Sequence, residues 1–263
     1  MMIVLNLLRS IFFLSLLFLQ ACHGHEEING EQGFKTAAKA QVAAAYNSQL
    51  GMAYLQQGDI PRAKRKLLTA LDLNPGSSDV NASMAYFLEK TGDSKGAKTY
   101  YQRALSLSAH SGAQLNNYGA FLCRQGDYRN AERLFLKAVQ DIHYINTAAA
   151  YENAGLCAAA IPDYKKAKQY FLKALTQDQK RKQSLLELVN IELKQKKPKL
   201  ALLHLQNYSN LLNTNSELLA VAVNAARQTG NVELAELYRK RLATIKHSRD
   251  YTGANNEYNS SNG

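Results

Sequence analysis

Small and bulky apolar residues recur along this chain with a fixed period of 34 residues. Glycine or alanine stands at one place in three successive periods, alanine at two others, and a bulky residue at a fourth. These sets are Gly51, Ala85 and Gly119; Ala63, Ala97 and Ala131; Ala70, Ala104 and Ala138; and Leu67, Tyr101 and Phe135. A period of this length indicates a supersecondary unit that stacks on copies of itself.

Each period is divided by a glycine that is followed directly by aspartate, as in Gly58-Asp59, Gly92-Asp93 and Gly126-Asp127. Glycine readily takes the left-handed backbone that ends a helix, and aspartate caps the helix that follows. The pattern therefore predicts two antiparallel helices per period, joined by a tight turn. No such hairpin buries its apolar face alone, so we expect the core to form by stacking.

The order of small, bulky and alanine positions resembles the tetratricopeptide repeat. The resemblance implies an all-α fold, a right-handed superhelix of about six repeats. The expected frames are 44–77, 78–111, 112–145, 148–181, 182–215 and 216–249, with a two-residue insertion before the fourth. The last two frames are less regular, and Arg239 replaces the bulky residue in the sixth.

The first 21 residues have the features of a secretory signal. Arg9 precedes a short apolar stretch at 11–19, and the segment ends in Leu-Gln-Ala-Cys22. This ending resembles a bacterial lipobox, which implies cleavage before Cys22 and acylation of its thiol. An uncleaved signal anchor is the alternative. His23, rather than aspartate, follows the cysteine, so by resemblance to Gram-negative lipoproteins we expect anchoring at the periplasmic face of the outer membrane.

The predicted organisation has four parts. Residues 1–21 are a lipoprotein signal peptide, 22–43 the lipidated N-terminus and tether, 44–249 the repeat domain, and 250–263 a disordered tail that is poor in apolar residues. The formal charge of +11 could attract nucleic acid, anionic lipid or an acidic protein partner. Because the basic residues are scattered and the chain is expected to be exported, solvated helix faces are favoured, and nucleic acid is not expected.

Candidate chemistry is sparse. His23 and His25 flank Gly24 but lack the further ligands that zinc needs, and the glycines occupy packing positions rather than a phosphate loop. We therefore expect no metal, no cofactor, no small-molecule substrate and no enzymatic activity. A periplasmic enzyme or small-ligand-binding protein is the less favoured alternative.

Two further cysteines fall on the first helices of neighbouring repeats, Cys123 in the third and Cys157 in the fourth. Export makes oxidation possible, so a disulfide between them is expected. Two buried thiols acting as small apolar residues are the alternative.

First helices line the concave face of this architecture, and that groove is the candidate protein-binding surface. An apolar groove with scattered polar groups suits an amphipathic helix or an extended peptide. Ordinary packing between repeats is the alternative for the apolar members. Glu89 and Glu152 are also expected on this face. The groove residues singled out are Met52, Leu55, Tyr86, Asn116, Ala120 and Leu156.

The segments 115–123 and 151–157, with the lipobox, are similar to the type IV pilus biogenesis and stability lipoproteins of the PilF/PilW family. That resemblance implies a pilotin, which helps the pilus secretin reach the outer membrane and form its multimeric ring. The partner would then be the secretin, held in the groove. An outer-membrane adaptor for peptidoglycan hydrolases or for other envelope assembly is the alternative.

Overall fold

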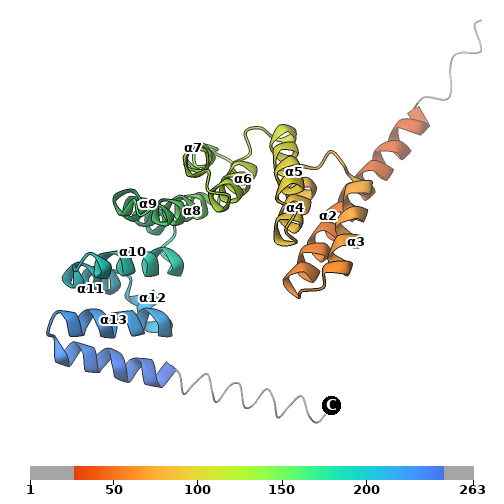
Figure 1. Ribbon diagram of the computed structural model, residues 1–263. Helices are drawn as coiled ribbons and strands as arrows, with labels where there is room; N and C mark the ends of the chain where they lie inside the picture. Colours follow the sequence, from red (N-terminus) through yellow and green to blue (C-terminus); the bar gives the residue numbers. More distant parts are fainter. Residues whose placement is uncertain (1–26, 246–263) are drawn as a thin grey trace, which may run out of the picture. The chain divides into compact units, whose positions relative to one another are not determined.

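The computed structural model describes residues 27–245, and every regular element in this part of the chain is an α-helix. Figure 1 shows the helices following one another as hairpins. The first seven are α2 (Glu27–Gln56), α3 (Ile60–Leu73), α4 (Ser78–Lys90), α5 (Ser94–Leu107), α6 (Gly112–Arg124), α7 (Tyr128–Ala138) and α8 (Thr147–Ala160). There follow α9 (Tyr164–Gln177), α10 (Lys182–Lys194), α11 (Pro198–Asn207), α12 (Ser209–Thr214), α13 (Ser216–Gln228) and a last helix over 232–245.

The described helices fall into the predicted hairpin pairs, one pair in each of the six frames. The all-helical repeat fold predicted from the 34-residue period is therefore confirmed. The chain divides into two compact units, one up to Ser83 and the other from Met84 onward. Among the described residues, no helix is both long and apolar enough to span a bilayer.

In the first unit, α2 and α3 form one hairpin, which lies in the orange part of Figure 1. Leu67 of α3 is fully buried, and a Cβ built on Gly51 of α2 would lie 2.7 Å from its Cγ. The small residue therefore lets the two helix backbones approach closely. The alanines before and after Leu67 in the pattern, Ala63 and Ala70, are also completely buried.

Helix α2 begins at Glu27, well before the frame that opens at residue 44. The extension is rich in alanine, which has the highest helix propensity, so the helix continues beyond the hairpin contact. The predicted tether therefore contains helix from Glu27 onward. Residues 1–26 and 246–263 lie outside the described part, and with them the signal peptide, Cys22, His23, His25 and the predicted tail.

In the second unit, aromatic rings fill the space between the two helices of a hairpin. Phe121, Phe135 and Phe171 are among the largest fully buried side chains. Phe135 and Phe171 occupy the bulky position of the third and fourth repeats and pack against Gly119 and Gly155, where an added Cβ would lie 2.9 and 2.5 Å from the ring. The 34-residue pattern thus reflects a packing rule in the first, third and fourth repeats, where Leu67, Phe135 and Phe171 each face a glycine on the other helix of the hairpin.

The turns inside the hairpins have the predicted chemistry. Gly58, Gly92 and Gly126 all have positive φ, between 79° and 93°. The aspartate after each glycine accepts a hydrogen bond from a backbone N–H three residues further on, as Asp93 does from Gly96 at 2.8 Å. In the fourth repeat Pro162 replaces the glycine and has φ of 24°.

The fifth repeat departs from the regular pattern, because its second helix is broken. Helix α11 ends at Asn207, Tyr208 leaves helical geometry, and α12 resumes for six residues. Asn215 then caps α13 by accepting from the backbone N–H groups of Glu217 and Leu218. The sequence predicts this hairpin but not its break.

Candidate functional site

The residues predicted to line the groove all lie on the first helix of their hairpin. Met52 and Leu55 belong to α2 in the first unit, whereas Tyr86 on α4, Asn116 and Ala120 on α6 and Leu156 on α8 belong to the second unit. Except for Asn116, each of these side chains is partly exposed. Within the second unit, Tyr86, Ala120 and Leu156 therefore retain surface that a partner could contact.

Asn116 is predicted to line the groove, and the structure places its side chain against the neighbouring repeat. Its side chain is only 9% exposed, and its Oδ1 accepts a hydrogen bond from Nδ2 of Asn153 at 2.9 Å. The two amides join α6 to α8 and satisfy polar atoms that burial would otherwise leave unpaired. Asn116 therefore stabilises the contact between repeats three and four.

Glu89 is also held inside the stack. Its Oε2 accepts hydrogen bonds from Arg124 Nη2 at 2.9 Å and from the Tyr101 hydroxyl at 3.1 Å. Burial raises the pKa of Tyr101 above its ordinary range, and the neighbouring carboxylate raises it further. The ion pair runs from α4 to α6, so it links the second hairpin to the third.

Glu152 links the fourth hairpin to the fifth in a similar way. Its Oε2 accepts from the hydroxyl and backbone N–H of Ser184 at 2.7 and 3.2 Å, while Arg181 Nη1 lies 3.2 Å from Oε1. A carboxylate at the N-terminus of α10 satisfies donors that the helix leaves unpaired and interacts favourably with its dipole. Both glutamates predicted for the groove thus bind neighbouring repeats.

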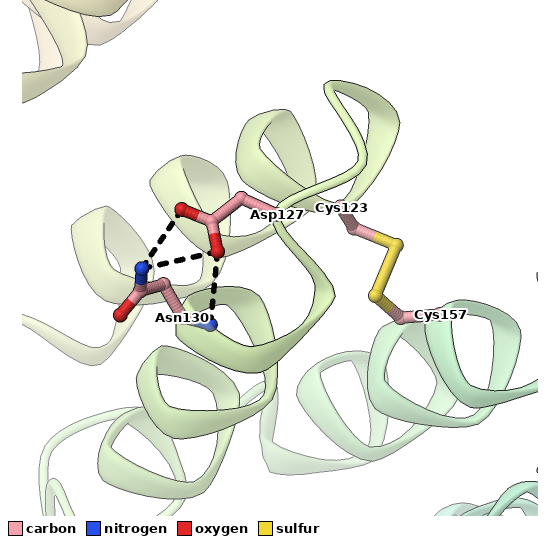
Figure 2. The surroundings of a disulfide bond; sticks show 4 residues. All are labelled: Cys123, Asp127, Asn130 and Cys157. Carbon is pink, nitrogen blue, oxygen red and sulfur yellow. Dashed lines mark hydrogen bonds between the residues drawn. A yellow bond between two sulfur atoms is a disulfide. The ribbon is translucent and has the colours of Figure 1, made fainter. Parts of the chain in front are cut away.

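Cys123 of α6 and Cys157 of α8 are joined by a disulfide, with their Cα atoms 5.8 Å apart. Figure 2 shows the bond spanning the two helices, with the Asp127 cap of α7 beside it. Asp127 accepts from the Asn130 backbone N–H at 3.3 Å and from its side-chain amide. This cross-link adds a covalent connection where the Asn116–Asn153 hydrogen bond also lies.

A cavity of about 600 Å³ lies between repeats three and four, next to the disulfide. None of the predicted groove residues lines it. Its walls combine apolar atoms with charged groups from both hairpins: Gly126, Asp127, Tyr128, Arg129, Glu132, Ala154, Cys157, Ala158, Ile161, Asp163 and Lys166.

Glu132 is one of the charged groups that line this cavity. It accepts hydrogen bonds from the Tyr170 hydroxyl at 2.6 Å and from Lys166 Nζ at 2.9 Å. Burial alone would raise the pKa of its carboxyl, but these two donors outweigh burial and lower the pKa below its ordinary value. Burial and the adjacent carboxylate raise the pKa of Tyr170.

Among the described residues, no three histidine, cysteine or acidic side chains gather as a metal-binding group. His204 lies 3.0 Å from the buried carboxylate of Glu192, within its own hairpin. The polar side chains at these junctions thus have structural partners. The second unit offers a ligand a surface with exposed apolar and basic positions.

The sequence of the chain is similar to a known repeat family and to a known pilus protein. The sequence pattern of the tetratricopeptide repeat matches residues 48–113 and 111–180, together about half of the chain. The chain is 34% identical over 148 residues to the type IV pilus assembly protein PilF of Pseudomonas aeruginosa. That match covers 56% of this chain and 59% of PilF, so the aligned part is less than two thirds of the relative's length.

Solved structures agree with this similarity. A structure from a functional study of Pseudomonas aeruginosa PilF superposes with a TM-score of 0.65 at 28% identity, covering 83% of this chain and 99% of that one. The type IV pilus biogenesis factor PilW superposes with a TM-score of 0.63 at 23% identity, over 76% and 92%. The resemblance predicted from the two cysteine segments is thus confirmed.

Proposed function

Since the chain belongs to the tetratricopeptide-repeat family, we propose that it acts as a protein-binding scaffold in type IV pilus biogenesis. The observation that carries the proposal is the similarity to PilF across the stacked hairpins, in sequence and in structure. A scaffold also suits the site, because the junction carboxylates are occupied by structural partners and the exposed positions are apolar or basic.

The partner we propose is the pilus secretin. A segment of it would lie against the partly exposed side chains of Tyr86, Ala120 and Leu156, which come from the first helices of three successive hairpins. Amphipathic helices and extended segments bind such surfaces through regularly spaced apolar anchors. The Glu89–Arg124 pair joins α4 to α6 and the disulfide joins α6 to α8, so these contacts hold the surface together before the partner arrives. Such preorganisation lowers the entropic cost of binding.

The second part of the proposal is anchoring through Cys22 at the periplasmic face of the outer membrane. The support is the lipobox-like ending of the signal segment. One acyl chain holds a protein only marginally, whereas a multiply acylated cysteine anchors it firmly. A pilotin anchored in this way would carry its secretin to the membrane in which the ring assembles.

The deciding experiment is deletion of the gene in its own bacterium, followed by assay of heat-resistant secretin multimers and of surface pili. We expect both to be lost and to return with the wild-type gene. Persistence of both after deletion would overturn the pilotin function. Complementation with Cys22→Ala tests the anchor separately, because normal outer-membrane secretin rings with that variant would remove anchoring from the mechanism.

The binding surface can be tested by capturing partners from envelope extracts with wild-type protein, Leu156→Glu and Leu203→Glu. Leu156 lies on a first helix, whereas Leu203 is an exposed leucine on the second helix α11. We expect the secretin with wild-type and Leu203→Glu protein and its loss with Leu156→Glu. Capture of peptidoglycan hydrolases in place of the secretin would favour the envelope-adaptor alternative.

A further inference from the structure

The connection between α7 and α8 carries the two most exposed large apolar side chains of residues 36–245. Ile142 and Ile145 are each 91% exposed, while the next, Val232, is 76% exposed. They lie in the loop that contains the two-residue insertion of the sequence, which has no counterpart in the other regular frames. Exposed isoleucines this close together indicate a contact site rather than scattered surface residues.

The loop is held in place by hydrogen bonds and packing. Asp141 accepts from the backbone N–H of Gly112 at 2.6 Å and from that of His143 at 2.9 Å. Tyr144 is partly buried and packs so closely on Gly112 that an added Cβ there would lie 2.5 Å from Tyr144 Cβ. The loop that carries the two isoleucines is therefore attached to the start of α6 through Asp141 and Tyr144, while the isoleucines themselves are exposed.

The helix that leads into this loop is basic along one face. Arg129, Arg133 and Lys137 follow one another at four-residue spacing on α7, and all three are exposed. With Leu136, Gln140 and Lys166 they line a shallow hollow of about 550 Å³, in which the only carboxylate is Glu132. Lys166 and Tyr170 already bind that carboxylate.

Positive charge also flanks the loop from the next hairpin. Arg181, in the connection between α9 and α10, lies close enough to the Tyr144 hydroxyl to act on its pKa, and Lys180 precedes it in the chain. Two carboxylates near the loop have partners. Asp141 accepts hydrogen bonds from two backbone N–H groups, and Asp178 forms an ion pair with Arg181 at 3.4 Å. The loop is thus flanked by Lys137 at the end of α7 and, near Tyr144, by Arg181, while Asp141 keeps its own negative charge.

We propose that the loop 141–146 and the basic face of α7 form a docking surface for anionic phospholipid. The isoleucines would enter the interfacial region, and Arg129, Arg133 and Lys137 would meet the headgroup phosphates. Apolar insertion beside a basic helix face is how interfacial elements hold to anionic bilayers. The exposed isoleucines supply the apolar part of such a contact, and the exposed cations of α7 match the negative charge of the headgroups.

The inference goes beyond the proposed function and does not depend on which protein the scaffold binds. It would give the protein a second membrane contact, more than a hundred residues from Cys22. Two membrane contacts would restrict the orientation of the protein more than a single contact does.

The test uses the full chain reconstituted in lipid vesicles. Because the protein contains no tryptophan, Ile142→Trp introduces a single fluorophore at the loop, and Val232→Trp is the matched control at another exposed position. Vesicles of phosphatidylcholine, with or without phosphatidylglycerol, carry lipids brominated on the acyl chains as quenchers. Ile145→Trp is a second reporter, and circular dichroism verifies that each variant retains its helix.

We expect blue-shifted and quenched emission from Ile142→Trp and Ile145→Trp in phosphatidylglycerol vesicles, and neither change from Val232→Trp. Adding Arg133→Glu and Lys137→Glu to a loop reporter removes two cations, each of which contributes about 1 kcal/mol near an anionic surface. The affinity for phosphatidylglycerol vesicles should therefore fall on the order of tenfold or more. Unquenched loop reporters would overturn the proposal. So would equal quenching at position 232, or an emission shift caused only by added envelope protein.

Discussion

Arg124 at the end of α6 binds Glu89 of α4, one hairpin earlier in the chain, and the Tyr101 hydroxyl donates to the same carboxylate. The side chain of Glu89 is mostly buried, whereas that of Arg124 is substantially exposed. The free-energy contribution of the pair therefore comes mainly from satisfying the glutamate and the tyrosine, because solvent screens the guanidinium.

Glu89→Gln should lower the free energy of unfolding by about 1–3 kcal/mol, since it weakens the acceptor shared by Tyr101 and Arg124. Arg124→Ala should cost less, because its loss leaves the tyrosine bond in place. Urea unfolding followed by circular dichroism measures both. Equal losses from the two variants would contradict the central place given to the carboxylate.

Removing the cross-link with Cys123→Ser and Cys157→Ser should destabilise the oxidised protein by about 2–4 kcal/mol, the usual range for a disulfide. The same loss should follow from reducing the wild-type protein, while reductant should leave the double variant unchanged. Thiol titration of the denatured, unreduced protein provides the control. Two reactive thiols at positions 123 and 157 under those conditions would show that the bond is absent.

Gly155→Ala tests the pairing of small and bulky residues. An added Cβ would lie 2.5 Å from Cε1 of Phe171, which is completely buried. Overpacking costs about 1–3 kcal/mol, while replacing a helical glycine returns roughly 1 kcal/mol, so we expect a net loss of stability. Gly76→Ala is the control, because its nearest atom would be Asn74 Oδ1 at 3.8 Å. A more stable Gly155→Ala protein would refute the packing rule.

Glu132 should make stability depend on pH. Its folded pKa lies below the ordinary value of 4.5, because hydrogen bonds from Tyr170 and Lys166 outweigh burial. A carboxyl with a lowered folded pKa contributes stability above its unfolded pKa and loses it as the pH falls through the folded pKa. Unfolding measured from about pH 6 down to pH 3 should therefore decline more steeply in wild-type protein than in Glu132→Gln. Parallel profiles would show that Glu132 does not contribute.

The sequence predicts the hairpins well because their signals are local and repeated. Gly58, Gly92 and Gly126 end first helices at the expected positions, and the aspartates after them cap second helices. The pairing of Cys123 with Cys157 could also be inferred, since the repeat frame puts both on neighbouring first helices. Each of these features depends on a residue's position within the 34-residue period, and that position can be counted in the sequence.

Other features depend on contacts between periods, which spacing alone does not determine. Asn116, Glu89 and Glu152 occupy positions that face the groove in an idealised repeat, yet each reaches a partner 29 to 37 residues away. Whether such a side chain faces solvent or a neighbour depends on small offsets between hairpins. The break at Tyr208 is similar, because its flanking sequence carries neither glycine nor proline to mark it.

The disulfide joins the third and fourth of six hairpins, so the only covalent cross-link among the described residues lies in the interior of the array. Repeat proteins lose structure from their ends, where each unit has one neighbour instead of two. Local unfolding that starts at the C-terminal hairpins would therefore stop at the cross-linked pair of hairpins. A protease would then trim the array towards a resistant fragment containing both cysteines.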